Sequence, residues 1–136
     1  MSEIIQPTVR AFRGATTIDA DTPEQILQRV QELVAEMFAC NALVPDDAIS
    51  LMITATADIH SLHPATAARR WGLDDVPIMG AQEIDIPGGL GLCIRTMLHA
   101  HTTLGRHDVR HVFLHEAIVL RPDLVDQRAA ALPDQP

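Results

Sequence analysis

The longest regular pattern of apolar positions lies between Thr22 and Asn41. Thr22 is a good helix N-cap, Pro23 occupies the first helical position, and Gln25 completes a capping-box pattern. The apolar positions that follow recur at spacings of three, four and one, which places them on one helix face: Ile26, Leu27, Val30, Leu33, Val34, Met37 and Phe38. The spacing predicts an amphipathic helix that ends near Asn41.

Shorter apolar segments predict strands and two further helices. The expected strands cover residues 8–13, 49–55, 76–86 and 109–114. The first of them is expected to stop at Gly14, and the second reads as a central strand. The expected helices cover residues 64–71 and 90–101, the latter after the glycine turn Pro87-Gly88-Gly89.

This alternation predicts an α+β (α/β-like) domain with a mixed β-sheet and helices on one face. The helical connections are long enough for crossovers between parallel strands. The other sheet face then needs a cover, and a homo-oligomer is an economical way to provide one. The 136 residues favour a single domain, which we assign to residues 1–124, with a flexible C-terminal tail at residues 125–136.

Composition narrows the function classes. A net charge of −8 argues against a nucleic-acid partner, which would require a basic face. No run approaches the ~18 apolar residues of a membrane span, and no signal-peptide pattern is seen, so we expect no membrane partner and a cytoplasmic location. All ten basic residues are arginine, which excludes Schiff-base chemistry on lysine. Arginine's planar fork suits carboxylates.

The sequence predicts no metal site. Cys40 and Cys93 lie in helix-like contexts without metal-type spacing, so both are expected as free thiols. Seven histidines are present, but none comes with a carboxylate or cysteine in a recognisable ligand pattern: His60, His63, His99, His101, His107, His111 and His115. On the predicted helix, His99 and His101 would point to different sides.

The segment from Val76 to Arg95 carries the most informative charges. Glu83 stands among apolar neighbours in a strand-like run, and Arg95 follows in the helix-like segment after the glycine turn. Isolated charges are costly to bury, so such groups usually have partners. From spacing alone, the pair fits either a small site for a charged, hydroxylated molecule or a surface salt bridge.

Several short motifs occur together in a fixed order. They are Arg13-Gly14-Ala15-Thr16-Thr17, Thr54-Ala55-Thr56-Ala57-Asp58-Ile59-His60, Val76-Pro77, Gln82-Glu83-Ile84-Asp85, Gly88-Gly89-Leu90, Cys93-Ile94-Arg95, Arg110-His111-Val112-Phe113-Leu114 and Val119-Leu120-Arg121-Pro122-Asp123-Leu124. Each is weak alone, but collinear from about Val9 to Leu124 they resemble the monofunctional chorismate mutases of the trimeric pseudo-α/β-barrel class.

The resemblance implies an isomerase of the shikimate pathway, in aromatic amino acid biosynthesis. The implied reaction is the Claisen-type [3,3] rearrangement of chorismate to prephenate, with no covalent intermediate and no cofactor. Such an enzyme holds the substrate in a compact shape and stabilises charge on the ether oxygen, by positioning and electrostatic preorganisation. The resemblance also implies a homotrimer with active sites at the subunit interfaces.

The resemblance assigns catalytic roles to three residues. Arg95 matches the cation that bonds the ether oxygen and a substrate carboxylate. Arg13 matches the arginine that grips the enolpyruvyl side chain. Glu83 matches the carboxylate that accepts the ring hydroxyl.

Seven further positions match substrate-binding positions of the family. Arg69 matches an arginine at the mouth, Arg121 one that orders the C-terminal tail, and Leu120 an apolar wall. The alternative is that both arginines are solvated or form structural pairs, and this alternative has more weight for Arg121 than for Arg69. Where the family usually has tyrosine, cysteine, threonine and phenylalanine, this chain has Phe113, Gly80, Met79 and His63 respectively, and Thr66 replaces a lysine at the mouth.

These departures leave three readings open. The first is a divergent chorismate mutase with compensating contacts. The second is a mutase for a relative such as isochorismate, converted to isoprephenate. The third is an inactive ligand-binding paralogue.

Overall fold

The computed structural model describes residues 5–120, so Arg121 and the predicted tail lie outside the described range. Its helices and strands are β1 (Thr8–Thr17), α1 (Pro23–Cys40), β2 (Ala48–Ala55), α2 (Pro64–Ala68), β3 (Ile78–Gln82), β4 (Cys93–Thr102) and β5 (Val112–Phe113). The chain also contains four short helical turns: η1 (Pro45–Asp47), η2 (Arg69–Leu73), η3 (Arg106–Asp108) and, after β5, η4 (His115–Val119).

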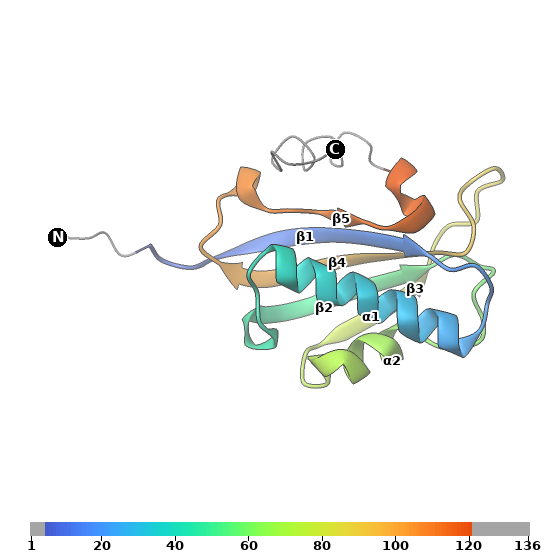
Figure 1. Ribbon diagram of the computed structural model, residues 1–136, viewed down its shortest axis with the longest axis horizontal. Helices are drawn as coiled ribbons and strands as arrows, with labels where there is room; N and C mark the ends of the chain where they lie inside the picture. The colour runs from blue at the N-terminus through green and yellow to red at the C-terminus, as the bar shows by residue number, and fades with distance from the viewer. Residues whose placement is uncertain (1–4, 121–136) are drawn as a thin grey trace.

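The strands form one mixed sheet in the order β3-β2-β4-β1-β5. The long strand β4 lies antiparallel to both β1 and β2, whereas β3 and β5 pair in parallel at the two edges. Helices α1 and α2 pack on one face of the sheet (Figure 1). The predicted α+β class, with a mixed sheet and helices on one face, is confirmed.

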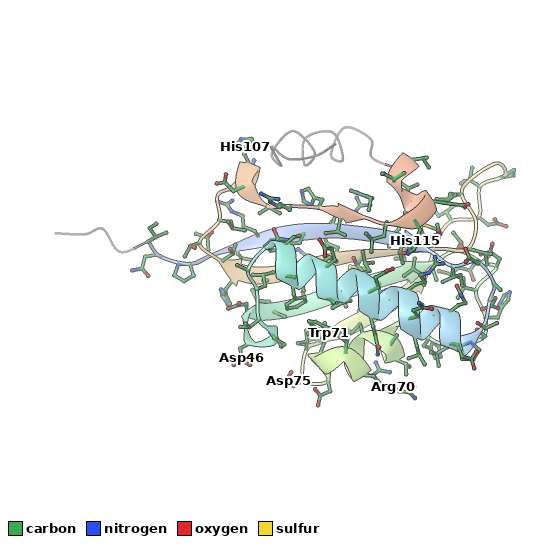
Figure 2. All side chains as sticks on the ribbon, in the orientation of Figure 1. Asp46, Arg70, Trp71, Asp75, His107 and His115 are labelled. Carbon is green, nitrogen blue, oxygen red and sulfur yellow. The ribbon has the colours of Figure 1, made fainter. Side chains whose placement is uncertain are left out.

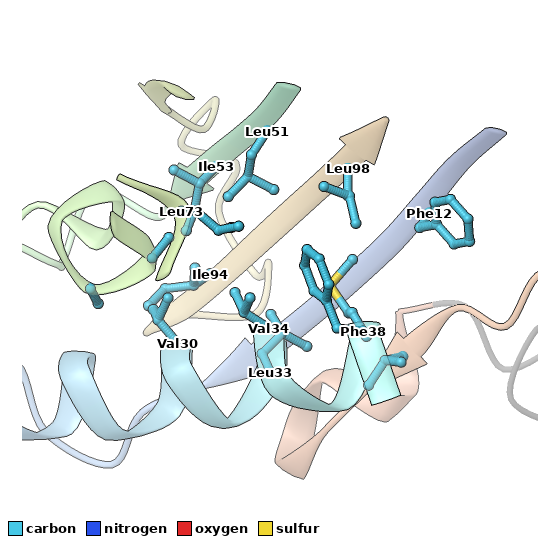
Figure 3. Close-up of a cluster of buried hydrophobic side chains, with 14 of the residues drawn as sticks. Phe12, Val30, Leu33, Val34, Phe38, Leu51, Ile53, Leu73, Ile94 and Leu98 are labelled. Carbon is cyan, nitrogen blue, oxygen red and sulfur yellow. The ribbon is translucent and has the colours of Figure 1, made fainter. Parts of the chain in front are cut away.

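The core lies between α1 and the sheet. Figure 3 shows Val30, Leu33 and Val34 of α1 directed at β4, where Ile94 and Leu98 are fully buried. Burying each such side chain stabilises the fold by about 1.5–3 kcal/mol. Gly14 is required here, because a Cβ at this position would lie 2.5 Å from both Met37 Sδ and Thr96 Oγ1.

Helix α1 begins and ends where the sequence predicts. The Thr22 hydroxyl accepts a hydrogen bond from Gln25 N at 3.2 Å, and Asn41 follows the last helical residue. The Gln25 side chain does not complete a capping box, because its Oε1 accepts from Asp19 N. The Asn41 side chain bonds both the backbone N–H and the carbonyl of Arg110, which fixes the approach to β5.

The helix predicted for residues 90–101 is wrong, since this segment forms β4. From Ile94 onward its buried positions alternate, with Ile94, Thr96, Leu98 and Ala100 all inside. That period of two is a strand signal, and the preceding glycines obscured it. Arg95 and Cys93 therefore lie on a central strand. In a strand, residues two apart share a face, so His99 and His101 point to the same side rather than to different ones.

Several strand boundaries also differ from the prediction. Strand β1 continues through Gly14 to Thr17, because the glycine packs against α1 instead of ending the run. The strand predicted at 76–86 covers only β3, and the one predicted at 109–114 covers only β5. Strand β5 ends at Phe113, and the chain turns at His115, whose φ of 54° is incompatible with an extended strand. Among residues 5–120, no helix has the length and apolar character needed to cross a membrane.

Candidate active site

The face of the sheet opposite α1 carries a row of side chains that crosses all five strands. Strand register places Arg95 of β4 between Thr54 of β2 and Ala15 of β1. Ala15 in turn pairs with Phe113 of β5, and Thr54 with Ala81 of β3. Because paired residues project to the same side of a sheet, all five belong to the uncovered face.

Glu83 and Arg95 come together on this face. Arg95 Nε lies 3.2 Å from Glu83 Oε2, and their side chains are 36% and 18% exposed respectively. Thr54 donates its hydroxyl hydrogen to the same Glu83 oxygen at 3.1 Å. Glu83 lies one residue past β3, and its backbone N–H bonds Ala55 O at 2.9 Å. Strand β2 therefore fixes both the backbone and the side chain of Glu83.

The contact between the two charges is not a well-aligned hydrogen bond. Arg95 Nε is one of two buried side-chain polar atoms among the described residues that lack a hydrogen-bond partner, the other being Thr16 Oγ1. At the half-buried surface of the sheet, opposite charges attract more strongly than in bulk water. A guanidinium offers five N–H donors, so Arg95 has more bonding capacity than Glu83 uses. The arrangement can bind an oxyanion and a hydroxyl side by side.

Arg13 of β1 lies on the same face, two residues before Ala15. It pairs with Met97 of β4, two residues from the position of Arg95, and shares a face with Ala15. The neighbouring positions across β4, β2 and β3 are all methionines: Met97, Met52 and Met79. Met79 is 66% exposed, so this row presents adaptable apolar surface beside the charges.

A small apolar cluster lies beside the charges at the β5 edge. Phe113 is buried against Ala15 and Ala117, and Leu120 packs on the same cluster. Turn η4 returns over the sheet here and is tied to α1, because His115 Nε2 lies 2.8 Å from Glu32 Oε1. Figure 2 shows His115 close to α1. The cluster forms an apolar wall next to Arg95, which pairs with Ala15.

The other predicted binding residues occupy a second region of the chain. His63, Arg69 and Gly80 line a pocket of about 790 Å³, which we name the edge pocket. Its remaining walls come from β2, β3, the loop before α2 and the first residues of α2. Gly80 projects to the opposite face from Met79, because adjacent strand residues alternate. Arg69 is exposed, and its Nη2 bonds Thr66 Oγ1 at 3.2 Å.

Within one chain, the predicted residues therefore fall into two groups. Arg13, Glu83, Arg95 and Phe113 share the uncovered sheet face, which we name the sheet-face site. The edge pocket does not include any of these four residues. Arg121 lies outside the described residues.

Burial sets the ionisation of the thiol nearest to Arg95. Cys93 is fully buried and lies two residues before Arg95 on the same face of β4. Burial raises the pKa of the Cys93 thiol, and the hydrogen bond from Arg95 opposes that rise only in part. The thiol is therefore neutral at ordinary pH and leaves the guanidinium as the local positive charge.

Sequence reasoning did not single out Thr54 or Ala15. Both stand in motifs that carry the family resemblance, yet neither has a charged side chain that would suggest a role in catalysis. Their roles come from strand register, which places them on either side of Arg95. Only recognition of β4 as a strand would have revealed them. Within residues 5–120, no group of three or more His, Cys, Asp or Glu side chains is arranged to hold a metal ion.

Comparison with known proteins identifies the family. The model of the family described as "Chorismate mutase type I" matches residues 9–124. The chain belongs to this family, and the resemblance stated from its motifs is confirmed.

Individual relatives agree with this assignment. The chain is 41% identical over 117 residues to a protein named chorismate mutase AroH from Bacillus subtilis, covering 85% of this chain and 92% of that protein. It is 42% identical to chorismate mutase AroH of Thermus thermophilus, covering 85% and 96%. The solved structure of a chorismate mutase from Clostridium thermocellum superposes with a TM-score of 0.79 at 42% identity, covering 81% of this chain and 98% of that one.

Proposed function

We propose that this protein is a chorismate mutase, an isomerase that converts chorismate to prephenate. The observation that carries the proposal is the half-buried Arg95–Glu83 pair at 3.2 Å, set on the uncovered sheet face of a chorismate mutase type I fold. The reaction is an intramolecular [3,3] rearrangement, so it needs positioning and charge stabilisation but no nucleophile or cofactor.

Arg95 supplies the main electrostatic term in this proposal. As the ether bond breaks, negative charge develops on the enolpyruvyl oxygen. A guanidinium hydrogen-bonded to that oxygen stabilises the transition state more than the ground state, which is what accelerates the reaction. Because the Cys93 thiol is neutral, no thiolate offsets the positive charge of the Arg95 guanidinium.

Glu83 and Arg13 orient the substrate around Arg95. The Glu83 carboxylate accepts the ring hydroxyl, and its bond from Thr54 keeps it in place. Arg13 binds the carboxylate of the enolpyruvyl group from the adjacent strand. The cluster of Phe113 and Leu120 forms the apolar wall. Phe113 has no hydroxyl to donate to a carboxylate, and a hydrogen bond to a charged group is worth about 1.5–3 kcal/mol.

We further propose that the enzyme is a homotrimer, because the two groups of predicted residues are separate within one chain. The uncovered sheet face exposes apolar side chains, including Val9, Met52 and Met79, which a neighbouring subunit would cover. A neighbour's edge pocket would then bring Arg69, His63 and Gly80 against the sheet-face site. Arg121 would close the site from the C-terminal segment. Light scattering tests this directly, since a monomer would contradict a shared site.

One observation favours a second candidate substrate. A Cβ added at Gly80 would meet nothing closer than Ile53 O at 3.6 Å, so neither space nor backbone conformation demands glycine there. Gly80 therefore enlarges the edge pocket, and His63 in the same pocket adds a polar group. A substrate whose ring hydroxyl sits on a different carbon, such as isochorismate, would use that room.

The experiment follows the loss of absorbance from purified chorismate and, in parallel, from isochorismate. The expected result is turnover of chorismate by the native chain and its near loss in Arg95→Ala. Turnover of isochorismate alone would replace the primary function with the second candidate. A folded protein that turns over neither compound would be a ligand-binding paralogue. We also propose a cytoplasmic location and a role in aromatic amino acid biosynthesis; growth complementation of a strain that lacks chorismate mutase tests the role, and cell fractionation tests the location.

A further inference from the structure

The turn that follows β2 connects the two strand ends that carry Glu83 and Arg95. Ala55 O accepts the Glu83 N–H at 2.9 Å, and the N–H of the next residue, Thr56, donates to Cys93 O at 3.0 Å at the start of β4. The two charged residues thus share a common backbone support. Asp58 lies in this turn, two residues beyond Thr56.

The Asp58 carboxylate makes two hydrogen bonds that converge on the start of β4. Oδ2 accepts from Leu92 N at 2.9 Å, and Oδ1 accepts from the Thr56 hydroxyl at 2.6 Å. Because the Thr56 hydroxyl has one hydrogen and gives it to Asp58, its lone pairs are turned to the Cys93 N–H, which donates at 3.0 Å. One carboxylate thereby fixes two successive amides just before Arg95.

The backbone at this point needs such support. Leu92 adopts φ 47°, a left-handed conformation that is unfavourable for a residue with a branched side chain. The Leu92 carbonyl accepts a hydrogen bond from Ile18 N at 2.9 Å, so both the N–H and the carbonyl of Leu92 have partners. Gly91 leaves room for the carboxylate, since a Cβ there would lie 2.8 Å from Asp58 Oδ2.

We propose that Asp58 is a positioning residue for Arg95: it sets the start of β4 and hence the place of the guanidinium relative to Glu83. The proposal rests on the proposed function, because the consequence of misplacing Arg95 is lost transition-state stabilisation. It acts through backbone placement and requires no contact between Asp58 and substrate.

The test compares steady-state kinetics of Asp58→Ala, Asp58→Asn and Asp21→Ala in the full-length protein. Asp21 is the matched control, because its carboxylate holds the same loop from the other side through His60 N and the backbone and hydroxyl of Ser61. Asp58→Ala is expected to lower kcat by about tenfold with little change in KM, since sub-ångström misplacement of a charge-stabilising group costs rate rather than binding. Asp58→Asn keeps an acceptor for Leu92 and recovers part of the loss. Asp21→Ala is expected to keep kcat within about twofold, because the Asp21 carboxylate bonds His60 and Ser61 and leaves the bond from Leu92 N to Asp58 at the start of β4 intact.

A double-mutant cycle with Gly91 separates positioning from general destabilisation. Gly91→Ala alone displaces the carboxylate and is expected to lower kcat as Asp58→Ala does. In the Asp58→Ala background the same change meets no carboxylate, so it should have almost no further effect. Circular dichroism and thermal melting establish that each variant is folded.

Three results would overturn the proposal. One is a kcat for folded Asp58→Ala equal to that of the native enzyme. Another is an equal loss in Asp21→Ala, which would assign the effect to the loop as a whole. The third is the same effect of Gly91→Ala in both backgrounds. An inactive native enzyme would instead remove the proposed function, and this inference with it.

Discussion

The two faces of β4 use the same strand for different purposes. Toward α1, Ile94, Thr96 and Leu98 are buried in the core and alternate with residues of the other face. Toward the uncovered side, Arg95 and Met97 are only partly buried, and Arg95 faces Glu83. One face holds the strand in place, and the other presents a charge whose position depends on that rigidity. A central strand holds such a group in a well-defined position, because backbone hydrogen bonds to the strands on both sides limit the strand's motion.

The largest expected effect on stability comes from the helix-covered face. Leu98→Ala removes a side chain that is 1% exposed and leaves a cavity, so the free energy of unfolding should fall by about 2–5 kcal/mol. Denaturant unfolding measures this loss. At a temperature where the variant remains folded, its kcat should stay close to that of the native protein. A strong fall in kcat with little loss of stability would contradict the view that the helix-covered face contributes stability and the uncovered face contributes catalysis.

The uncovered face should show the opposite pattern. Glu83→Gln retains size but removes the charge that accepts the ring hydroxyl, so kcat/KM should fall by about tenfold to a hundredfold. The melting temperature should change little, because the Glu83–Arg95 pair is partly exposed and such pairs contribute little to stability. Steady-state kinetics and a melting curve of the same preparation measure the two effects together. A large drop in melting temperature would mean that Glu83 is mainly structural.

A gain-of-function change sharpens the comparison at the β5 edge. Phe113→Tyr adds a hydroxyl to a side chain that lies in the same row as Arg95. If a substrate carboxylate approaches this wall, kcat/KM for chorismate should rise, by up to about tenfold. Phe113→Leu serves as the control, because it keeps an apolar wall without a donor. A fall in kcat/KM on adding the hydroxyl would indicate that the wall faces an apolar part of the substrate.

The smallest expected effect concerns acid stability. Burial alone would raise the pKa of Asp58, but the hydrogen bonds from the Thr56 hydroxyl and the Leu92 N–H outweigh it and lower the pKa. A carboxyl group with a lowered folded-state pKa stabilises the fold above its unfolded pKa of about 3.9, and that stabilisation is lost as pH falls through the folded value. The native protein should thus exceed Asp58→Asn in stability at pH 6, and the gap should close below about pH 4. Urea unfolding at several pH values tests this, and a constant gap would contradict it.

Much of the fold could be predicted from local pattern. The apolar spacing from Ile26 to Phe38 marks α1 unambiguously, and the caps at Thr22 and Asn41 fix its ends. The prediction of a helix at β4 is wrong, because Gly88 and Gly89 suggest a turn into a helix whereas the segment after them is a strand. Its period of two is set by pairing with β1 and β2, partners remote in sequence, so local propensity could not decide it.

The candidate site was predictable by motif but not by geometry. The family resemblance singled out Arg13, Glu83 and Arg95 as a group, and the register of three strands brings them to one face. The roles of Thr54 and Asp58 depend on hydrogen bonds that form only in the folded chain. No local sequence pattern encodes those contacts, because each joins segments about thirty residues apart.

The most direct test of the central claim is the kcat of Arg95→Ala on saturating chorismate, measured beside its melting temperature. If Arg95 stabilises charge that develops only in the transition state, kcat should fall by about a hundredfold to a thousandfold or more. The melting temperature should remain close to the native value, because the side chain is 36% exposed and packs outside the core. A kcat near the native value in the folded variant would contradict the account.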